Sequence, residues 1–327
     1  SRRGAPAHID AAGAGAVIPD RLAVGAEVAA AIAAGRPVVA LESTLISHGL
    51  PYPANLEVAR ASEAAIRESA AVPATVAIHD GRLLVGLDDA ALEELATAPA
   101  GSVRKASRPS LAAALGAGGW AATTVSATMI AAHAAGIRVF ATGGIGGVHR
   151  GALAASGGSV PTLDISSDLE ELGRTPMAVV CAGPKAILDV PATLEYLETR
   201  GVPVVTIGQA EVPGFYARSS GIASPQVATS VGEAARMAAV HLDLELGGLL
   251  ICVPVPAADA LPDDVARDAV DQAIAEGAAA GIAGPALTPW LLARIAAITN
   301  GASVRANTAL IVNDARIAGQ IAVALRG

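Results

Sequence analysis

Short runs of consecutive apolar residues recur along this chain, separated by longer segments with helical spacing. Predicted strands of this kind lie at residues 37–44, 138–141, 178–183, 202–208 and 247–256. Short, continuously apolar runs are typical of strands that are buried on both faces, as in a parallel sheet covered by helices. The alternation therefore predicts an α/β protein with a mainly parallel sheet and helices on both of its faces.

The intervening segments predict helices, one hairpin and one polar loop. Helical spacing is found at residues 21–35, 55–69, 88–96, 123–135, 191–199, 263–280 and 305–325, and Trp290 lies in a further predicted helix. Residues 74–87 predict a β-hairpin, because Asp80-Gly81 is a turn signal between two strand-like runs. Residues 104–110, RKASRPS, predict a polar loop that contains Lys105.

Length and charge limit the functional class. No long linker interrupts the 327 residues, so we expect a single catalytic domain over 21–327, preceded by a flexible, glycine-rich arm over 1–20. A net charge of −8 and only 2% aromatic residues argue against a nucleic-acid surface. The uncharged stretch 109–137 is rich in Ala, Gly, Ser and Thr, which predicts a buried helix and not a membrane span.

The two cysteines, Cys181 and Cys252, each lie inside an apolar strand-like run. This placement favours buried free thiols over a disulfide or a metal pair. We therefore expect a reducing, cytoplasmic compartment.

Polar side chains follow three of the predicted strands, at the point where each strand ends. Glu42 follows VVAL, Thr142 follows VFA, and Lys185 comes just after AVVCAG. Open α/β sheets bind ligands at the carboxyl ends of their strands. We therefore expect an acid, a glycine-rich turn and an amine to meet at one edge of the sheet.

The segment between Thr142 and Lys185 is the densest in chemistry. The glycines of TGGIGG let backbone N–H groups approach a ligand, and His149 and Arg150 follow directly. Asp164 and Asp168, four residues apart around two serines, suit a hydrated divalent cation or the hydroxyls of a sugar. The spacing departs from the dinucleotide-binding, P-loop and hydrolase-elbow patterns, and the scattered histidines lack zinc-ligand spacing.

Lysine is rare in this chain, where Lys105 and Lys185 are the only two among 22 basic residues. Unlike arginine, a lysine amine loses its proton when it is desolvated or lies near another cation, and it is then a nucleophile. Such an amine attacks a masked aldehyde such as C1 of a sugar and forms an iminium, which accepts the electrons of a breaking carbon–carbon bond. Glu42 would then supply or remove the proton.

Long motifs from about residue 24 to residue 325 closely resemble the pseudouridine-5′-phosphate glycosidases, which are related to the indigoidine synthase A proteins. They include ALESTLISHGLPYP, RKASRPSL, ATGGIGGVHRG, DISSDLEEL and VVCAGPKAILDVPATLEYLETRGVPV. The resemblance implies a three-layer α/β/α fold with a smaller subdomain, and a homotrimer. It also implies reversible cleavage of the C–C glycosidic bond of pseudouridine 5′-phosphate to uracil and ribose 5-phosphate. The loop over 151–161 is longer than the family pattern leads us to expect.

The resemblance also implies a role for individual residues. Lys185 matches the nucleophile that holds C1 of the ribose as an imine, Glu42 the proton donor, and Asp164 the manganese (Mn²⁺) ligand. The substrate-binding positions are matched by Lys105, Val125, Ser166, Ser167 and Asp168, together with Thr142, His149 and Asn307.

Each role has a simpler alternative. Glu42 could cap the end of a strand, and Lys185 could bind a phosphate without attacking the sugar. Asp164 could cap a helix. Asp168 could lie outside the substrate shell, and His149 could be structural.

Two other functions also remain open at this stage. A Schiff-base aldolase on another phosphosugar would need the same lysine and acid. A nucleotide-binding protein without catalysis would bind its ligand and form no covalent adduct.

Overall fold

The computed structural model describes residues 18–153, 161–282 and 287–326. Its strands are β1 Leu22–Val24, β2 Val38–Leu41, β3 Val72–His79, β4 Arg82–Val85, β5 Arg104–Ala106, β6 Trp120–Thr123, β7 Val139–Ala141, β8 Val148–His149, β9 Ala178–Cys181, β10 Leu188–Asp189, β11 Val204–Ile207, β12 Gln226–Ala228 and β13 Leu249–Cys252. Its helices are α1 Ile18–Arg21, α2 Ala26–Ala33, α3 Thr44–His48, α4 Ala54–Glu68, α5 Asp89–Thr97, α6 Leu111–Gly116, α7 Val125–Ala134, α8 Ser167–Leu172, α9 Val190–Thr199, α10 Val231–Asp243, α11 Asp263–Ala279, α12 Leu287–Ile298 and α13 Ala302–Ala324, with a 3-10 turn, η1, at Arg108–Ser110.

One mixed sheet runs through the protein in the order β1-β4-β3-β2-β7-β9-β13-β11-β12, and β6 pairs with both β3 and β5. The central pairs β2–β7, β7–β9 and β9–β13 are parallel. The first half of β3 pairs parallel with β2, and its second half pairs antiparallel with β4 and β6. The carboxyl ends of β2, β7 and β9 consequently meet at one edge.

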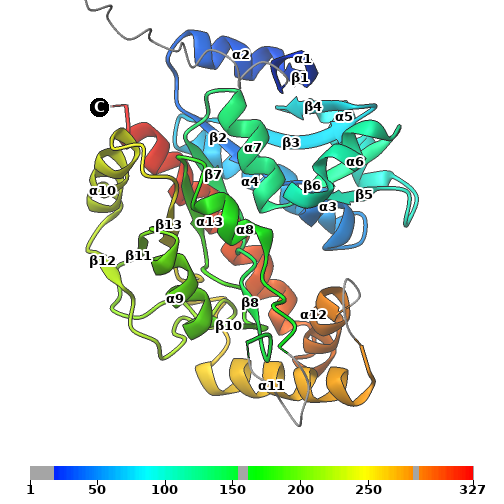
Figure 1. Ribbon diagram of the computed structural model, residues 1–327, viewed down its shortest axis with the longest axis vertical. Helices are drawn as coiled ribbons and strands as arrows, with labels where there is room; N and C mark the ends of the chain where they lie inside the picture. The colour runs from blue at the N-terminus through cyan, green and yellow to red at the C-terminus, as the bar shows by residue number, and fades with distance from the viewer. Residues whose placement is uncertain (1–17, 154–160, 283–286, 327) are drawn as a thin grey trace, which may run out of the picture.

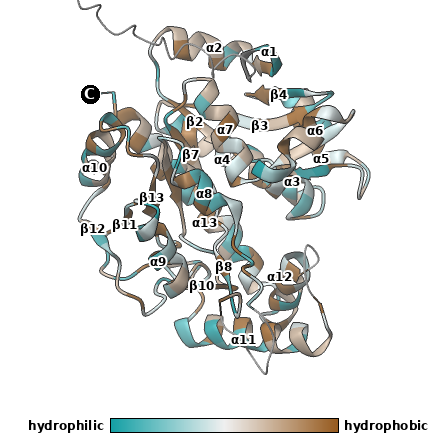
Figure 2. Cartoon of the chain, viewed as in Figure 1, coloured by the Kyte–Doolittle hydropathy of each residue, from teal (hydrophilic) through white to brown (hydrophobic). Residues whose placement is uncertain are grey.

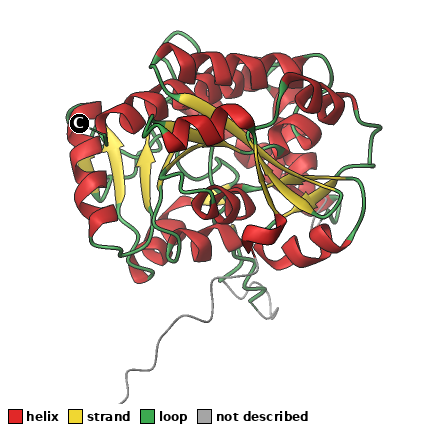
Figure 3. Ribbon diagram, turned by 90° about the horizontal axis from the view of Figure 1, so that it is seen from above, coloured by secondary structure: helices red, strands yellow, loops and turns green. Residues whose placement is uncertain are grey.

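Helices cover both faces of this sheet, as the view along it shows (Figure 3). Strand β2 shows why: Val38 and Ala40 belong to one hydrophobic cluster, and Val39 and Leu41 belong to another. The first cluster is completed by α2, α7, α8 and α9, and the second by α4, α10 and α13. Successive side chains of a strand point to opposite faces of the sheet, and here both faces are apolar. Each face is therefore covered by helices, which gives the three layers that the sequence predicts.

The long helix α13 connects the sheet to the lower part of the molecule (Figure 1). Its C-terminal half packs against α4 and β2, and its N-terminal half joins α11 and α12 in a separate hydrophobic cluster. Figure 2 shows the contrast between the brown strands at the centre and the teal surface of helices such as α11. The loops that follow β2, β7 and β9 lie between these two parts.

The hairpin and the two buried cysteines agree with the sequence analysis. Strands β3 and β4 pair across Asp80-Gly81, both with positive φ (43° and 77°), as a two-residue type I′ turn requires. Cys181 and Cys252 are buried free thiols that face each other in register on β9 and β13.

Four local predictions were wrong. Residues 21–35 are not one helix, because 22–24 pair with β4 as β1 before α2 begins. Residues 104–110 are not a loop, because 104–106 pair with β6 and 108–110 form η1. The stretch 109–137 is not one helix but contains α6, β6 and α7. Residues 18–20 of the predicted arm lie in α1, and the rest of the arm is outside the described residues.

Within the described ranges, no helix combines the length and apolar character needed to span a bilayer.

Candidate active site

A cavity of about 570 Å³ opens at the edge where β2, β7 and β9 end. Ten of the eleven predicted site residues line it: Glu42, Lys105, Val125, Thr142, His149, Ser166, Ser167, Asp168, Lys185 and Asn307. Asp164 is not among its lining residues. Segments that are far apart in the sequence are thus gathered in one space.

Glu42 is the first residue after β2, and it lies half-buried against the end of the neighbouring strand β7. The hydroxyls of Thr44 and Thr142 each donate a hydrogen bond to one of its carboxylate oxygens. The N-cap of the following helix α3 is Ser43 and not Glu42. Glu42 therefore lies between the end of β2 and the cap of α3, with both of its oxygens accepting threonine hydroxyls.

Lys185 lies on a short segment that follows β9. This segment is hydrogen-bonded to the turn formed by TGGIGG, residues 142–147, which we call the glycine turn. Ile145 donates its N–H to Gly183 O at 3.1 Å, and Lys185 donates its N–H to Ile145 O at 3.1 Å. Gly183 has a φ of +87°, a conformation that side chains rarely adopt. The backbone of residues 183–185 is consequently held by hydrogen bonds to the glycine turn.

Lys105, on β5, is the second amine of the cavity. Its pKa is lowered, first by burial and second by the positive charge of Lys185. The negative charges of Glu42 and Asp168 oppose this shift. The two amines and the two carboxylates therefore interact electrostatically across one space.

The carboxylate of Asp168 makes two backbone contacts that its spacing from Asp164 does not predict. Its side chain is buried, and its two carboxylate oxygens accept backbone N–H groups, from Ser126 at 3.1 Å and from Gly146 at 3.0 Å. Each of its oxygens thus accepts one backbone N–H, and the residue also lines the cavity. Asp168 joins the glycine turn to the first turn of α7.

The glycine turn is tightly covered. A Cβ added at Gly146 would lie 2.2 Å from Ser166 Oγ, and one at Gly144 would lie 2.5 Å from the ring of Phe215. Phe215 has a φ of +66°, which is strained for a residue with a side chain, and it lines the cavity. The glycines thus allow side chains to close over the turn from two sides.

The N-terminus of α7 contributes Val125 to the cavity, after Thr124 as the N-cap. Across from it, Ser166 caps α8 by accepting the N–H of Asp168 at 3.2 Å. The hydroxyl of Ser167 lies 3.2 Å from that of Ser126. Backbone N–H groups at a helix start, with hydroxyls beside them, are suited to an anion.

His149 and Asp164 lie at the rim, where β8 begins a two-stranded sheet with β10. His149 donates its N–H to Asp164 O at 3.0 Å, and its Nδ1 lies 3.9 Å from the Asp164 carboxylate. The Asp164 side chain is 54% exposed. In the part of the chain that is described, no group of three or more His, Cys, Asp or Glu side chains forms a ready metal site. Much of the predicted long loop, 154–160, lies outside the described residues.

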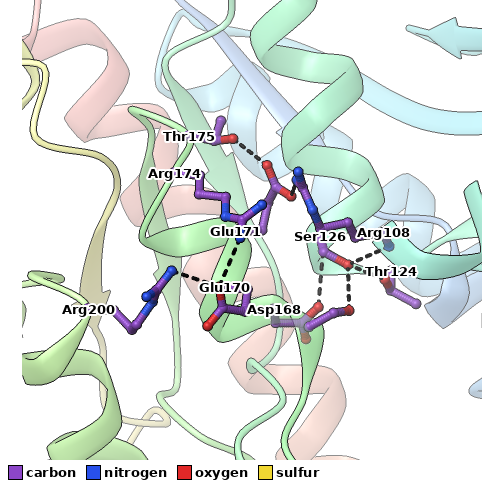
Figure 4. Close-up of polar contacts among 10 residues, drawn as sticks. Arg108, Thr124, Ser126, Asp168, Glu170, Glu171, Arg174, Thr175 and Arg200 are labelled. Atoms are coloured by element: carbon purple, nitrogen blue, oxygen red, sulfur yellow. Dashed lines mark hydrogen bonds and ion pairs between the residues drawn. The ribbon is translucent and has the colours of Figure 1, made fainter.

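Several residues around the cavity were missed by the sequence analysis. Ser107, His48 and Phe215 line it. Arg108 and Glu171, which do not line it, form an ion pair (Figure 4). The only signal for the pair was the placement of Arg108 three residues after Lys105. Its partner, 63 residues further along, has no signal in a single sequence.

The fold and the cavity define an α/β enzyme whose site combines a lysine, a glutamate and the start of helix α7. The comparisons make this specific. Residues 27–324 match the family described as indigoidine synthase A like protein, and the chain belongs to that family.

Named relatives cover nearly the whole chain. A pseudouridine-5′-phosphate glycosidase of Paracoccus denitrificans is 52% identical over 309 residues, which cover 94% of this chain and 99% of the relative. One of Solibacter usitatus is 52% identical over 306 residues, 93% of this chain and 99% of the relative. The crystal structure of the prealnumycin C-glycosynthase AlnA in complex with ribulose 5-phosphate is similar, with a TM-score of 0.84 and 38% identity over 93% of this chain and 97% of that chain. An indigoidine synthase A-like protein of Thermotoga maritima has a TM-score of 0.80 and 31% identity over 94% of this chain and 97% of its own.

Proposed function

We propose that this chain cleaves the C–C glycosidic bond of pseudouridine 5′-phosphate reversibly, giving uracil and ribose 5-phosphate. The observation that carries the proposal is that Glu42 and Lys185 line the same cavity, each following a strand of the central sheet. The relatives named as pseudouridine-5′-phosphate glycosidases, at 52% identity over nearly the whole chain, support the choice of substrate.

The reaction uses the lysine as a temporary partner of the sugar. The amine of Lys185 bonds to C1′ as the bond from C1′ to the ring oxygen breaks, and that oxygen takes the proton that the nitrogen loses. Glu42 delivers a proton to C5 of uracil. The lysine nitrogen then forms a double bond to C1′ as the C1′–C5 bond breaks. The electron pair of the broken bond restores the C5–C6 double bond of uracil, which opened when C5 took the proton. Water hydrolyses the imine and releases ribose 5-phosphate and the free amine.

The phosphate end of the substrate would lie between the wall of the cavity that carries Lys105 and the wall that carries Lys185. We place it against Lys105, the start of α7 at Val125, and the hydroxyls of Ser166 and Ser167, all of which line the cavity. A cation, helix N–H groups and hydroxyl donors together match an oxyanion of this kind. Thr142 would act through Glu42, to which it donates a hydrogen bond. Asn307, on α13, His149 and Asp168 are the remaining proposed substrate contacts.

A divalent cation is a further part of the proposal, with Asp164 as its protein ligand. Mg²⁺ and ions of its kind bind through one or two carboxylates and keep several waters, so a single exposed carboxylate fits a hydrated Mn²⁺. The half-exposed Asp164 side chain beside His149 meets this requirement. When bound, the ion would supply positive charge near the substrate at the rim of the cavity.

We also propose a homotrimer and a cytoplasmic location, which rest on the family resemblance and on the two buried free thiols. Light scattering on the purified protein measures the assembly directly. A mass of one or two chains would contradict the trimer.

The function is tested by incubating the protein with pseudouridine 5′-phosphate and measuring uracil by chromatography. We expect uracil and ribose 5-phosphate in equal amounts, and none from Lys185→Ala. An aldolase on another phosphosugar would release no uracil, and a binding protein would retain the nucleotide unchanged. Either result would overturn the proposal.

A further inference from the structure

The ion pair between Arg108 and Glu171 lies just outside the cavity and is not used by the proposed reaction. The Glu171 side chain is only 2% exposed, and the Arg108 side chain is 37% exposed. The guanidinium donates to one carboxylate oxygen of Glu171, and the hydroxyl of Thr175 donates to the other (Figure 4). A buried carboxylate needs such partners, because burial of an unpaired charge is costly.

Each member of the pair stands close in sequence to residues that line the cavity. Arg108 follows Lys105 and Ser107, and it begins η1. Glu171 lies on α8, one turn after Ser167. Neither Arg108 nor Glu171 lines the cavity itself. The pair therefore ties together two walls of the site without touching the space that a ligand would fill.

A third wall joins the same network through Ser126 on α7. The backbone N–H of Arg108 donates to Ser126 Oγ at 3.1 Å, and this oxygen lies 3.2 Å from Ser167 Oγ and 3.3 Å from Thr124 Oγ1. The polar contacts among these residues form one connected set in Figure 4. The start of α7 and the Ser167 hydroxyl are thus linked to Arg108 by hydrogen bonds, and Lys105 lies three residues before Arg108 in the chain.

We infer that Arg108 and Glu171 are a positioning pair that sets the spacing of the groups that bind the phosphate end of the sugar. The inference rests on the proposed function, since it assumes a phosphosugar in this cavity. The guanidinium donates to one oxygen of the buried carboxylate and Thr175 donates to the other, so the carboxylate is held from two sides. Loss of the pair should weaken phosphate binding and leave the uracil end of the site intact.

The test compares Glu171→Gln with Glu170→Gln. Glu170 is the adjacent residue on α8 and is also ion-paired, with Arg174 and Arg200, but its side chain is 29% exposed and these partners do not line the cavity. The two variants lose one carboxylate charge each on the same helix. The reaction is run in the direction of synthesis, from ribose 5-phosphate and uracil, and KM is measured for each. Inorganic phosphate serves as a competitive inhibitor that reports on the phosphate end alone.

For Glu171→Gln we expect KM for ribose 5-phosphate and the inhibition constant of inorganic phosphate to rise together, by roughly tenfold, as for a weakened charge-assisted hydrogen bond. KM for uracil should stay within about twofold, and Glu170→Gln should match the wild type in all three. Arg108→Lys, which keeps the charge and replaces the planar guanidinium by a shorter side chain with a single ammonium group, should change the same two constants in the same direction.

The inference is overturned if Glu171→Gln only lowers the melting temperature, or if KM for both co-substrates rises equally. It is also overturned if Glu170→Gln has the same effect. Should Glu171→Gln fail to fold, Arg108→Lys decides by the same three constants. A wild-type protein that forms no pseudouridine 5′-phosphate would refute the proposed function instead, so the two failures are distinguishable.

Discussion

The buried carboxyl of Asp314 should make the stability of this protein depend on pH. This residue of α13 is fully buried, and among the residues that the structure describes neither of its carboxylate oxygens has a partner with hydrogen-bond geometry. Burial raises the pKa of this carboxyl well above its usual range. The thiols of Cys181 and Cys252 interact with it electrostatically, and burial raises the pKa of both thiols as well. The folded protein therefore keeps a proton on Asp314 that the unfolded chain releases.

This difference makes the stability depend on pH. The unfolded carboxyl has a pKa of about 3.9, so below that pH both states hold the proton and the residue adds no pH dependence. Above it the folded state holds more protons than the unfolded state, and the free energy of unfolding falls by about 1.4 kcal/mol per pH unit up to the folded pKa. Asp314→Asn removes this dependence. Between pH 5 and pH 7 the stability of the wild type should therefore fall relative to that of the variant as the pH rises.

The assay is urea unfolding of the wild type, Asp314→Asn and Asp259→Asn at pH 5, 6 and 7. Asp259 is an exposed aspartate, so its variant should follow the wild type at every pH. A burial cost of the new amide would shift Asp314→Asn by a constant amount and leave the slope unchanged. A difference from the wild type that is the same at all three pH values would refute the reasoning, because it would mean that Asp314 is ionised in the folded protein.

Three further predictions concern the site. Glu42→Gln should lower kcat for uracil release by about 10² to 10⁴, since it removes the proton donor, and a kcat near that of the wild type would exclude this role. Gly146→Ala should destabilise the protein by about 1–3 kcal/mol and lower activity, because its Cβ would lie 2.2 Å from Ser166 Oγ; an unchanged melting temperature and activity would show that the turn can adapt. Treatment with a chelator should lower the activity of the wild type and Mn²⁺ should restore it, while Asp164→Ala should respond to neither; activity that is insensitive to chelation would remove Asp164 from the proposed metal site.

Much of the fold was predictable because the apolar pattern is local. Runs such as Val38–Leu41 are apolar at every position, and this feature alone indicates a strand with both faces covered. The strand at 104–106 escaped prediction because its sequence is polar and two of its three residues are exposed. It is a strand because it pairs with β6, which is a tertiary interaction. In the same way, residues 22–24 continue a helical pattern but pair with β4.

In the site, too, contacts between residues far apart in the chain could not be predicted. Residues directly after strands, such as Glu42, could be placed at the correct edge by the rule for parallel sheets. The role of Asp168 could not be predicted, because its oxygens accept N–H groups that are 22 and 42 residues earlier in the chain. Its spacing from Asp164 indicated a shared cation or the hydroxyls of a sugar, and gave no sign of these two backbone contacts.

The central claim is that Lys185 captures the opened sugar as an imine. It is tested most directly by incubating the protein with ribose 5-phosphate, reducing with borohydride, and locating the adduct by peptide mass spectrometry. We predict one reduced pentose phosphate on the peptide that contains Lys185, and none on the peptide that contains Lys105. An active enzyme that carries no adduct, or an adduct on Lys105 alone, would contradict the account.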